Sequence, residues 1–511
     1  MIDIEQTKFS TLSELIRRHA RKSPERTALA QGPHRVDYAA LDRNMDRVAC
    51  ALQHRGLVPG DTIAICAGTS VEYATAFLGA LRAGAVVAPL APGSTPASLQ
   101  RMLDDAQAKL LFVDAQADQA LGPATSPGAP RVLLRGAGDA ASFDDWLADA
   151  PASQPARVDL QAQSPFNIIY SSGTTGEPKG IVQSHGMRWS HVQRGARYGY
   201  GPDSVTLLAT PLYSNTTLVV LLPTLALGGS VLLMQKFEPG EYLQLAQACR
   251  VTHTMLVPVQ YQRLMAHTGF DAHDLLSFQY KFCTSAPFSA ALKAQVLRRW
   301  PGALVEFYGM TEGGGTCILE AHRFPDKLHT VGRPAEGHDI RLIDDAGLES
   351  AQGESGEVVG RSPGMMTGYH RRPDKTREAE WHDAQGQRFI RTGDIGRFDD
   401  QGFLTLLDRK KDLIISGGFN VYPSDLESTL REHAAVADVA VVGATSEQWG
   451  ETPVAFVVRS PGTGPSAAEL LGWANARLGK TQRLARLSFI DELPRSAIGK
   501  VLKSELRALA R

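Results

Sequence analysis

The chain has 511 residues, 43% of them hydrophobic, and because single cores stop growing near about 250–300 residues, more than one domain is expected. Its formal net charge of -1 gives no long-range attraction to nucleic acid or anionic membranes, so no nucleic-acid partner is predicted. The most apolar window, residues 218–229, is too short and too interrupted by proline for a membrane span, and the charged start of the chain is unlike a secretory signal. A cytoplasmic protein, monomer or homodimer, is expected.

Short apolar runs alternate with helical patterns along the first half of the chain. This alternation predicts an α/β fold with largely parallel, buried strands. Between residues 114 and 165 the composition shifts to Ala, Gly, Pro, Ser and Gln, which predicts surface loops. The runs expected to be strands are residues 62–66, 85–90, 110–114, 205–210 and 230–234.

The last part of the chain has a different pattern. Two strand-like runs, "VADVAVVG" and "PVAFVVR", precede a helical stretch at 467–478 and a terminal amphipathic helix from about Val501. This order predicts a small α+β domain behind the charged connection "DRKK". We expect a large multi-sheet domain over 1–407, a hinge over 408–411 and a small domain over 412–511.

The stretch "YSSGTTGEPKG", residues 170–180, gathers hydroxyls, glycines and one lysine behind an apolar run. Glycine permits close backbone approach, and hydroxyl, N–H and lysine groups suit phosphate oxygens, so a phosphate cradle is indicated. It is not a Walker A loop, because Lys179 is followed by glycine and not by the hydroxyl that would hold Mg²⁺. Residues 181–183 are expected to form a second strand, and Ser184 the N-cap of a helix through Trp189. A solvated surface turn is the alternative.

Three further stretches follow the loop in order: "YGMTEG" (308–313), "RTGDIGRFDDQGFLTLLDRKKDLIISGGFNVYPSDLE" (391–427) and "PRSAIGK" (494–500). Together they resemble the adenylate-forming, AMP-binding superfamily of acyl-CoA synthetases, firefly luciferase and nonribosomal adenylation domains, and in particular enzymes of the 4-coumarate–CoA ligase kind. The resemblance implies an acid–thiol ligase with a mobile small domain. In that reaction a carboxylate attacks the α-phosphate of ATP, giving acyl-AMP and pyrophosphate, and a thiol then displaces AMP.

The resemblance also implies which residues bind the nucleotide. Charge builds around the α-phosphorus and the departing pyrophosphate, so cations and oriented donors are needed there. Thr311 and Glu312 would be catalytic, with Glu312 reaching Mg²⁺ through the phosphates, and Asp394 would take the ribose hydroxyls beside Arg409. The other ATP- or AMP-binding residues implied are Ser171, Ser172, Gly173, Thr174, Thr175, Gly176, Lys179, Ser285, Ala286, Pro287, Tyr308, Gly309 and Met310.

Lys500, in the Gly-preceded loop "SAIGK", corresponds to the lysine that bridges carboxylate and phosphate in the family. Lys411 falls on the family's hinge position, about which the small domain rotates after adenylation. The rotation would withdraw Lys500 and present the glycine-rich strand that borders the pantetheine tunnel of coenzyme A. Its residues here are Ser416, Gly417, Gly418 and Phe419. ATP, Mg²⁺ and coenzyme A are the expected cofactor and co-substrates.

The acid pocket is expected between the loop and "YGMTEG". In "PLYSNTT" Ser214 stands where many relatives carry a histidine, and Asn215 resembles an asparagine that aryl-acid-activating relatives use. Hydrogen-bonding groups discriminate strongly for a hydroxyl, so a short, branched or aromatic acid, with or without a hydroxyl, is predicted over a long fatty chain. The alternative role of Ser214 is a helix N-cap. The pocket residues expected are Tyr213, Ser214, Asn215, Val259, Gly313 and Gly314.

The leading hypothesis is therefore a carboxylate–CoA ligase that forms AMP. One alternative is an adenylating enzyme that loads the pantetheine arm of a carrier protein. The other is a nucleotide-binding homologue without turnover, although Thr311, Glu312, Asp394, Arg409 and Lys500 are all present.

Overall fold

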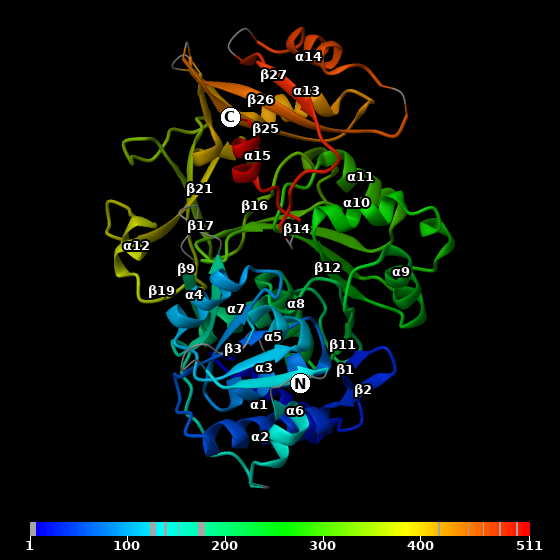
Figure 1. The fold of residues 1–511 in the computed structure, drawn as a ribbon, viewed down its shortest axis with the longest axis vertical. Helices are drawn as coiled ribbons and strands as arrows, with labels where there is room; N and C mark the ends of the chain where they lie inside the picture. The colour runs from blue at the N-terminus through cyan, green and yellow to red at the C-terminus, as the bar shows by residue number, and fades with distance from the viewer. Residues whose placement is uncertain are drawn as a thin grey trace. The chain divides into compact units, whose positions relative to one another are not determined.

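The computed structural model describes residues 7–122, 129–136, 141–151, 153–171, 179–416, 419–447, 449–462, 464–479, 482–496 and 499–510. The chain divides into two compact units (Figure 1). The first is Met1–Leu328 with Ala335–Asp339 and Arg361–Ile390, and the second is Arg391–Arg511 with His329–Pro334 and Ile340–Gly360. This is a mixed α/β fold with a larger N-terminal unit, as predicted; the hinge at 408–411 stays a prediction.

One sheet of the first unit runs in the order β19-β9-β8-β4-β3-β5-β6-β7. Its central pairs β4, β3 and β5 are parallel, whereas β8 and β9 are antiparallel and flank the glycine-rich loop. The strands are β3 (Thr62–Cys66), β4 (Val86–Leu90), β5 (Leu111–Asp114), β6 (Arg131–Arg135), β7 (Ala141–Ser142), β8 (Pro165–Ser171), β9 (Lys179–Ser184) and β19 (Gly368–Tyr369).

A second sheet runs β15-β14-β13-β12-β10-β11-β1-β2 within this unit, and its pairs from β14 to β11 and on to β1 are parallel. The five strands expected in the first half of the chain are thus confirmed, each within two residues of its predicted ends. The strands here are β1 (Thr27–Gln31), β2 (His34–Asp37), β10 (Val205–Leu208), β11 (Ser230–Leu233), β12 (His253–Leu256), β13 (Tyr280–Cys283), β14 (Ala303–Gly309) and β15 (Thr316–Glu320).

Helices of the first unit cover these sheets, and α1, α2, α3, α7 and α8 share one buried core with strands of both. Ser184 is the N-cap of α7, as predicted, and accepts a hydrogen bond from the Met187 amide. The helices are α1 (Leu12–Lys22), α2 (Tyr38–His54), α3 (Val71–Arg82), α4 (Pro96–Ala106), α5 (Ala115–Leu121), α6 (Phe143–Ala148), α7 (His185–Arg197), α8 (Asn215–Ala226), α9 (Pro239–Ala248), α10 (Pro258–Ala266), α11 (Ala290–Arg299) and α12 (Pro373–Glu378), with 3-10 turns η1 (Phe270–Ala272) and η2 (Pro325–Lys327).

The prediction of surface loops over 114–165 was wrong for its first part, whereas the described residues of 149–164 lie in no helix or strand, as expected. The segment contains α5, α6 and the strand β6, which pairs in parallel with β5. Val132, Leu133 and Leu134 are buried, and Trp146 packs edge-on against Phe112 in the core. The mean composition of the segment hid this short apolar run, and three buried residues are enough to add a strand to an existing sheet edge.

The second unit holds two further sheets. In the first of these sheets β18 lies between β17 and β21, and β22 also pairs with β21. In the second the order is β24-β23-β26-β25, and β27 pairs with β26. Helices α13 and α14 pack on one face of the latter and α15 on the other, as the upper part of Figure 1 shows. Among the described residues no helix is both long and apolar enough to cross a bilayer.

The two strand runs and two helices predicted for the end of the chain are confirmed as β25, β26, α14 and α15. The remaining elements are β16 (Arg333–Pro334), β17 (Asp339–Ile343), β18 (Gly356–Arg361), β20 (Glu380–His382), β21 (Arg388–Phe398), β22 (Leu404–Arg409), η3 (Lys410–Asp412), β23 (Ile414–Ser416), β24 (Phe419–Val421), α13 (Pro423–Arg431), β25 (Val436–Ser446), β26 (Gly450–Arg459), α14 (Ala467–Asn475), β27 (Arg486–Phe489) and α15 (Lys503–Leu509).

Candidate active site

The "YGMTEGG" segment forms the turn between β14 and β15. Tyr308 and Gly309 end β14, and Gly309 pairs with Thr316 across the antiparallel ladder. Gly313 has φ +71°, and a Cβ there would collide with the backbone carbonyl of Gly364. This close approach requires glycine at position 313 and holds Thr311 and Glu312 at the end of the sheet.

Glu312 is held from two sides. The Tyr369 hydroxyl donates to its Oε1 over 2.8 Å, and the Met366 amide donates to its backbone carbonyl over 2.7 Å. Lys179 Nζ lies 5.4 Å from the centroid of the Tyr369 ring. Burial and then the Glu312 charge raise the pKa of Tyr369, so it stays a neutral donor. Tyr369 therefore links two of the predicted residues, Lys179 and Glu312.

Tyr369 was missed by sequence reasoning, as was a buried polar group behind Thr311. Gln183 Nε2 donates to the Thr311 carbonyl over 2.7 Å and to Asn215 Oδ1 over 3.4 Å. Asn167 Nδ2 donates to Gln183 Oε1 over 3.0 Å, and Arg188 donates to both amide oxygens. Polar residues at apolar positions of β8 and β9 were the available signal.

The predicted nucleotide-binding residue Ser285 is joined by one hydrogen bond to Thr216, the neighbour of the predicted pocket residue Asn215. The hydroxyls of Ser285 and Thr216 are 2.7 Å apart, and Thr284 Oγ1 donates to the Phe307 carbonyl over 2.8 Å. Ser285 has φ +81°, an unfavourable conformation for a residue with a side chain, and such strain often marks a binding site. Ala286 and Pro287 follow it, and Pro287 is exposed.

Ser214 caps α8, accepting a hydrogen bond from the Thr216 amide over 3.3 Å. The alternative role of Ser214 as a helix N-cap is thus confirmed. Contact of Ser214 with the acid substrate stays a prediction. Tyr213 is partly buried beside this cap, and Asn215 begins the helix. Of the other predicted pocket residues, Val259 lies in α10 and Gly314 is buried in the turn after Glu312.

In the second unit the structure brings Asp394, Arg409, Lys411 and Lys500 together. Asp394 and Arg409 are directly opposite across β21 and β22, and their Oδ1 and Nε atoms are 3.0 Å apart. Burial, followed by the charges of Arg409 and Lys411, lowers the pKa of Lys500 to about 8, against the opposing effect of Asp394 and Asp412. Lys500 is therefore a cation that can lose its proton near neutral pH.

The predicted hinge residue lies between two anchored neighbours. Lys410 Nζ is 2.9 Å from Asp345 and 3.3 Å from Glu357, and Arg507 is 2.5 Å from Asp412. Lys411 itself is exposed. A rotation confined to the Lys410–Asp412 turn would need these contacts to change, together with the hydrogen bonds from Ser424 to Asp408 and to the Leu407 carbonyl.

Several predicted residues lie outside the described part of the chain. These are Ser172, Gly173, Thr174, Thr175 and Gly176 of the loop, together with Gly417 and Gly418. Their flanks are described: Ser171 pairs with Lys179 across β8 and β9, and Ser416 pairs with Phe419 across β23 and β24. The predicted strand on each side of the proposed phosphate loop is confirmed.

The donor set suits Mg²⁺ held partly by substrate. Within the described ranges no three His, Cys, Asp or Glu side chains gather as a metal site. Glu312 offers one carboxylate, whose Oε1 already accepts from Tyr369. Magnesium in nucleotide sites is bound by one or two carboxylates with phosphate and water, so Glu312 fits that role.

Comparison with known proteins gives the class. The AMP-binding enzyme family matches residues 16–370, and the AMP-binding enzyme C-terminal domain matches residues 425–500. The chain belongs to this family, the adenylate-forming superfamily, and is an enzyme of the acid–thiol ligase class.

Individual relatives cover nearly the whole chain. A feruloyl-CoA synthase of Amycolatopsis sp is 34% identical over 96% of this chain and 97% of its own length. A fatty acid–[acyl-carrier-protein] ligase, ScoC of Streptomyces coeruleorubidus, is 31% identical over 98% and 96%. The crystal structure of ATP-bound MatB from Rhodopseudomonas palustris matches with a TM-score of 0.88 and 31% identity, over 98% of this chain and 99% of that one.

Proposed function

We propose that the protein is an ATP-dependent carboxylate–CoA ligase that forms AMP. The observation that carries the proposal is the gathering of Lys500, Asp394 and Arg409 in the second unit. It puts the lysine proposed for adenylation beside the carboxylate proposed to hold the ribose of the same nucleotide. Relatives named as CoA synthases or ligases support the thiol acceptor.

In the first half-reaction a carboxylate oxygen of the acid forms a bond to the α-phosphorus, and the bond from that phosphorus to the β-bridging oxygen breaks. Pyrophosphate leaves, and acyl-AMP remains. Lys500 offsets the negative charge of the attacking carboxylate and the α-phosphate, and the loop from Ser171 to Lys179 holds the β- and γ-phosphates. Glu312 would hold Mg²⁺, whose charge offsets that of the phosphates.

In the second half-reaction a thiolate attacks the acyl carbon and AMP leaves, so that a thioester forms. We propose that rotation about Lys411 withdraws Lys500 and brings Ser416 to Phe419 to the pantetheine tunnel. Burial, followed by the charges of Arg409 and Lys411, lowers the pKa of Lys500, which supports this exchange, because moving the cation out relieves both effects.

The acid is proposed to be short, branched or aromatic, with a hydroxyl group accepted. The hydrogen bond between Ser285 and Thr216 joins the predicted nucleotide-binding residues 285–287 to the start of α8, and Gln183 donates a hydrogen bond to the Asn215 amide oxygen. Because Asn215 Oδ1 accepts from Gln183, its Nδ2 group is the one that can donate to an acid substituent.

A carrier protein is the second candidate acceptor, and the relative named as a fatty acid–[acyl-carrier-protein] ligase favours it. The experiment supplies ATP, Mg²⁺ and a carboxylate panel with either coenzyme A or a phosphopantetheinylated carrier protein, and follows pyrophosphate and thioester by mass spectrometry. We expect acid-dependent pyrophosphate and acyl-CoA. A thioester on the carrier alone would move the proposal to the second acceptor, and no acid-dependent pyrophosphate would support a homologue without turnover.

A further inference from the structure

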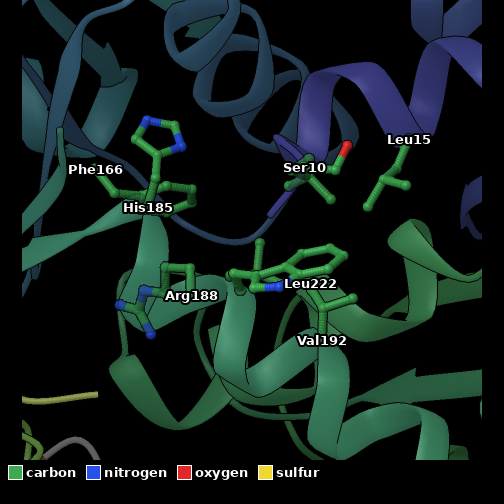
Figure 2. Close-up of a pocket in the computed structure, with 9 residues that line it drawn as sticks. Ser10, Leu15, Phe166, His185, Arg188, Val192 and Leu222 are labelled. Atoms are coloured by element: carbon green, nitrogen blue, oxygen red, sulfur yellow. The ribbon is translucent and has the colours of Figure 1, made fainter. Parts of the chain in front are cut away.

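One side of helix α7 carries three basic residues at spacings that place them together: Arg188, His191 and Arg194. Arg188 is only 2% exposed. Figure 2 shows it on α7 with its guanidinium directed away from the apolar side chains of Leu15, Val192 and Leu222. The Arg188 guanidinium therefore points away from these apolar side chains.

Neither arginine of this group, Arg188 or Arg194, has an acidic partner within the part of the chain that the structure describes. Arg188 donates only to the amide oxygens of Asn167 and Gln183 and lies 3.5 Å from His191 Nδ1. Arg194 lies over the Phe307 ring, 4.8 Å from its centroid. The next arginine of the helix, Arg197, is different, because it is exposed and is 2.5 Å from the Glu336 carboxylate.

Two histidines, His191 and His338, lie beside these arginines, and burial followed by the charge of Arg194 lowers the pKa of both, so they are neutral at pH 7. Arg194 acts electrostatically on both His191 and His338, and Arg188 acts on His191. Burial lowers the pKa of Arg188 to about 9, which leaves it charged at neutral pH. Burying like charges without a counterion is costly, so a cluster of this kind is more stable with an anion bound.

The cluster lies next to the predicted acid pocket. Arg188 contacts Gln183, which in turn donates to Asn215 and to the carbonyl of Thr311. His338 Nδ1 accepts from the Thr316 amide, and Thr316 pairs with Gly309 of the "YGMTEGG" segment. Phe307, under Arg194, is two residues before Gly309 on the same strand.

We propose that Arg188 and Arg194, with His191 and His338, form an anion subsite that selects an acid carrying a second negatively charged group, such as a dicarboxylate. This deepens the proposed function and rests on it. One carboxylate of the acid is adenylated, and the other is held by the guanidinium groups, which are well suited to bind a carboxylate with two hydrogen bonds.

The experiment compares acids that differ by one carboxylate, benzoate with isophthalate and butyrate with glutarate, by the kcat/KM of pyrophosphate release. We expect the native enzyme to prefer the diacid of at least one pair. Arg194→Met, which keeps the volume and removes the charge, should lower the diacid-to-monoacid ratio by about 10- to 100-fold. Arg197→Met on the same helix is the control and should leave the ratio unchanged.

Calorimetric titration of the same acids into the native protein and both variants gives a readout that does not need turnover. We expect tighter binding of a diacid, lost in Arg194→Met and kept in Arg197→Met. The anion subsite would be overturned if the native enzyme used and bound the monoacids as well as the diacids or better. It would also be overturned if Arg194→Met left the diacid-to-monoacid ratio of kcat/KM unchanged. Neither result would contradict the ligase activity. Absence of pyrophosphate release with every acid would contradict the proposed function, and the titration would still decide the subsite.

Discussion

The surroundings of Glu312 and of Lys500 differ in how charge is balanced. In the first unit Glu312 and Thr311 accept hydrogen bonds from neutral donors, Tyr369 and Gln183, on strands of one sheet. In the second unit Lys500 is buried close to two other cations, Arg409 and Lys411, and the carboxylates of Asp394 and Asp412 oppose their effect. A neutral, hydrogen-bonded frame suits groups that keep one position, whereas a crowded cation suits a group that enters and leaves a site. The difference supports a fixed metal and acid site and a movable lysine.

The largest expected effect follows from removing the movable cation. Lys500→Ala should lower adenylation, measured as acid-dependent pyrophosphate exchange, by at least about 100-fold, because the charge at the α-phosphate is no longer offset. Thioester formation from supplied acyl-AMP should be nearly unchanged. Lys503→Ala is the control, because Lys503 is near in sequence but is paired with Glu427 at 2.9 Å.

Restricting the turn should have the opposite effect. Lys411→Pro fixes φ in the Lys410–Asp412 turn, so we expect thioester formation from acyl-AMP to fall by about 10-fold or more while adenylation is kept. Both steps are measured as for Lys500→Ala. If the two substitutions reduced both half-reactions equally, domain rotation would lose its support.

The dependence on pH should separate the same two steps. Lys500 has its pKa lowered to about 8, so it is protonated below that pH and loses its charge as pH rises through it. Adenylation should therefore fall by about 10-fold between roughly pH 7 and pH 9, as expected for one group with this pKa. The rate of thioester formation from acyl-AMP should not fall over this pH range, either in the native enzyme or in Lys500→Ala. If the residual adenylation rate of Lys500→Ala fell with the same midpoint, the pH dependence would belong to another group.

The smallest effect is expected from the frame around Glu312. Tyr369→Phe removes the 2.8 Å hydrogen bond to the carboxylate, and loss of such a supporting contact weakens metal binding by about 10-fold or somewhat more. The Mg²⁺ concentration that gives half-maximal adenylation should rise accordingly, with kcat restored at high Mg²⁺. An unchanged Mg²⁺ dependence would show that the Tyr369 contact does not support a metal-binding carboxylate.

Local patterns predicted much of the fold, because short apolar runs and caps act through neighbours in sequence. The five early strands and the Ser184 cap are examples. The partners of the site could not be predicted, since Tyr369 reaches Glu312 from 57 residues away and Gln183 reaches Thr311 from 128 residues away. Such pairs depend on how β9, β14 and β19 are arranged, which no single segment of sequence specifies.

The central claim, attack of a carboxylate oxygen on the α-phosphorus, can be tested with an acid labelled with ¹⁸O at both carboxylate oxygens. The enzyme is incubated with this acid, ATP, Mg²⁺ and coenzyme A, and the ¹⁸O content of the nucleotide and phosphate products is measured by mass spectrometry. We predict AMP carrying one ¹⁸O and unlabelled pyrophosphate. Label in inorganic phosphate with ADP as the nucleotide product, or AMP without label, would contradict the account.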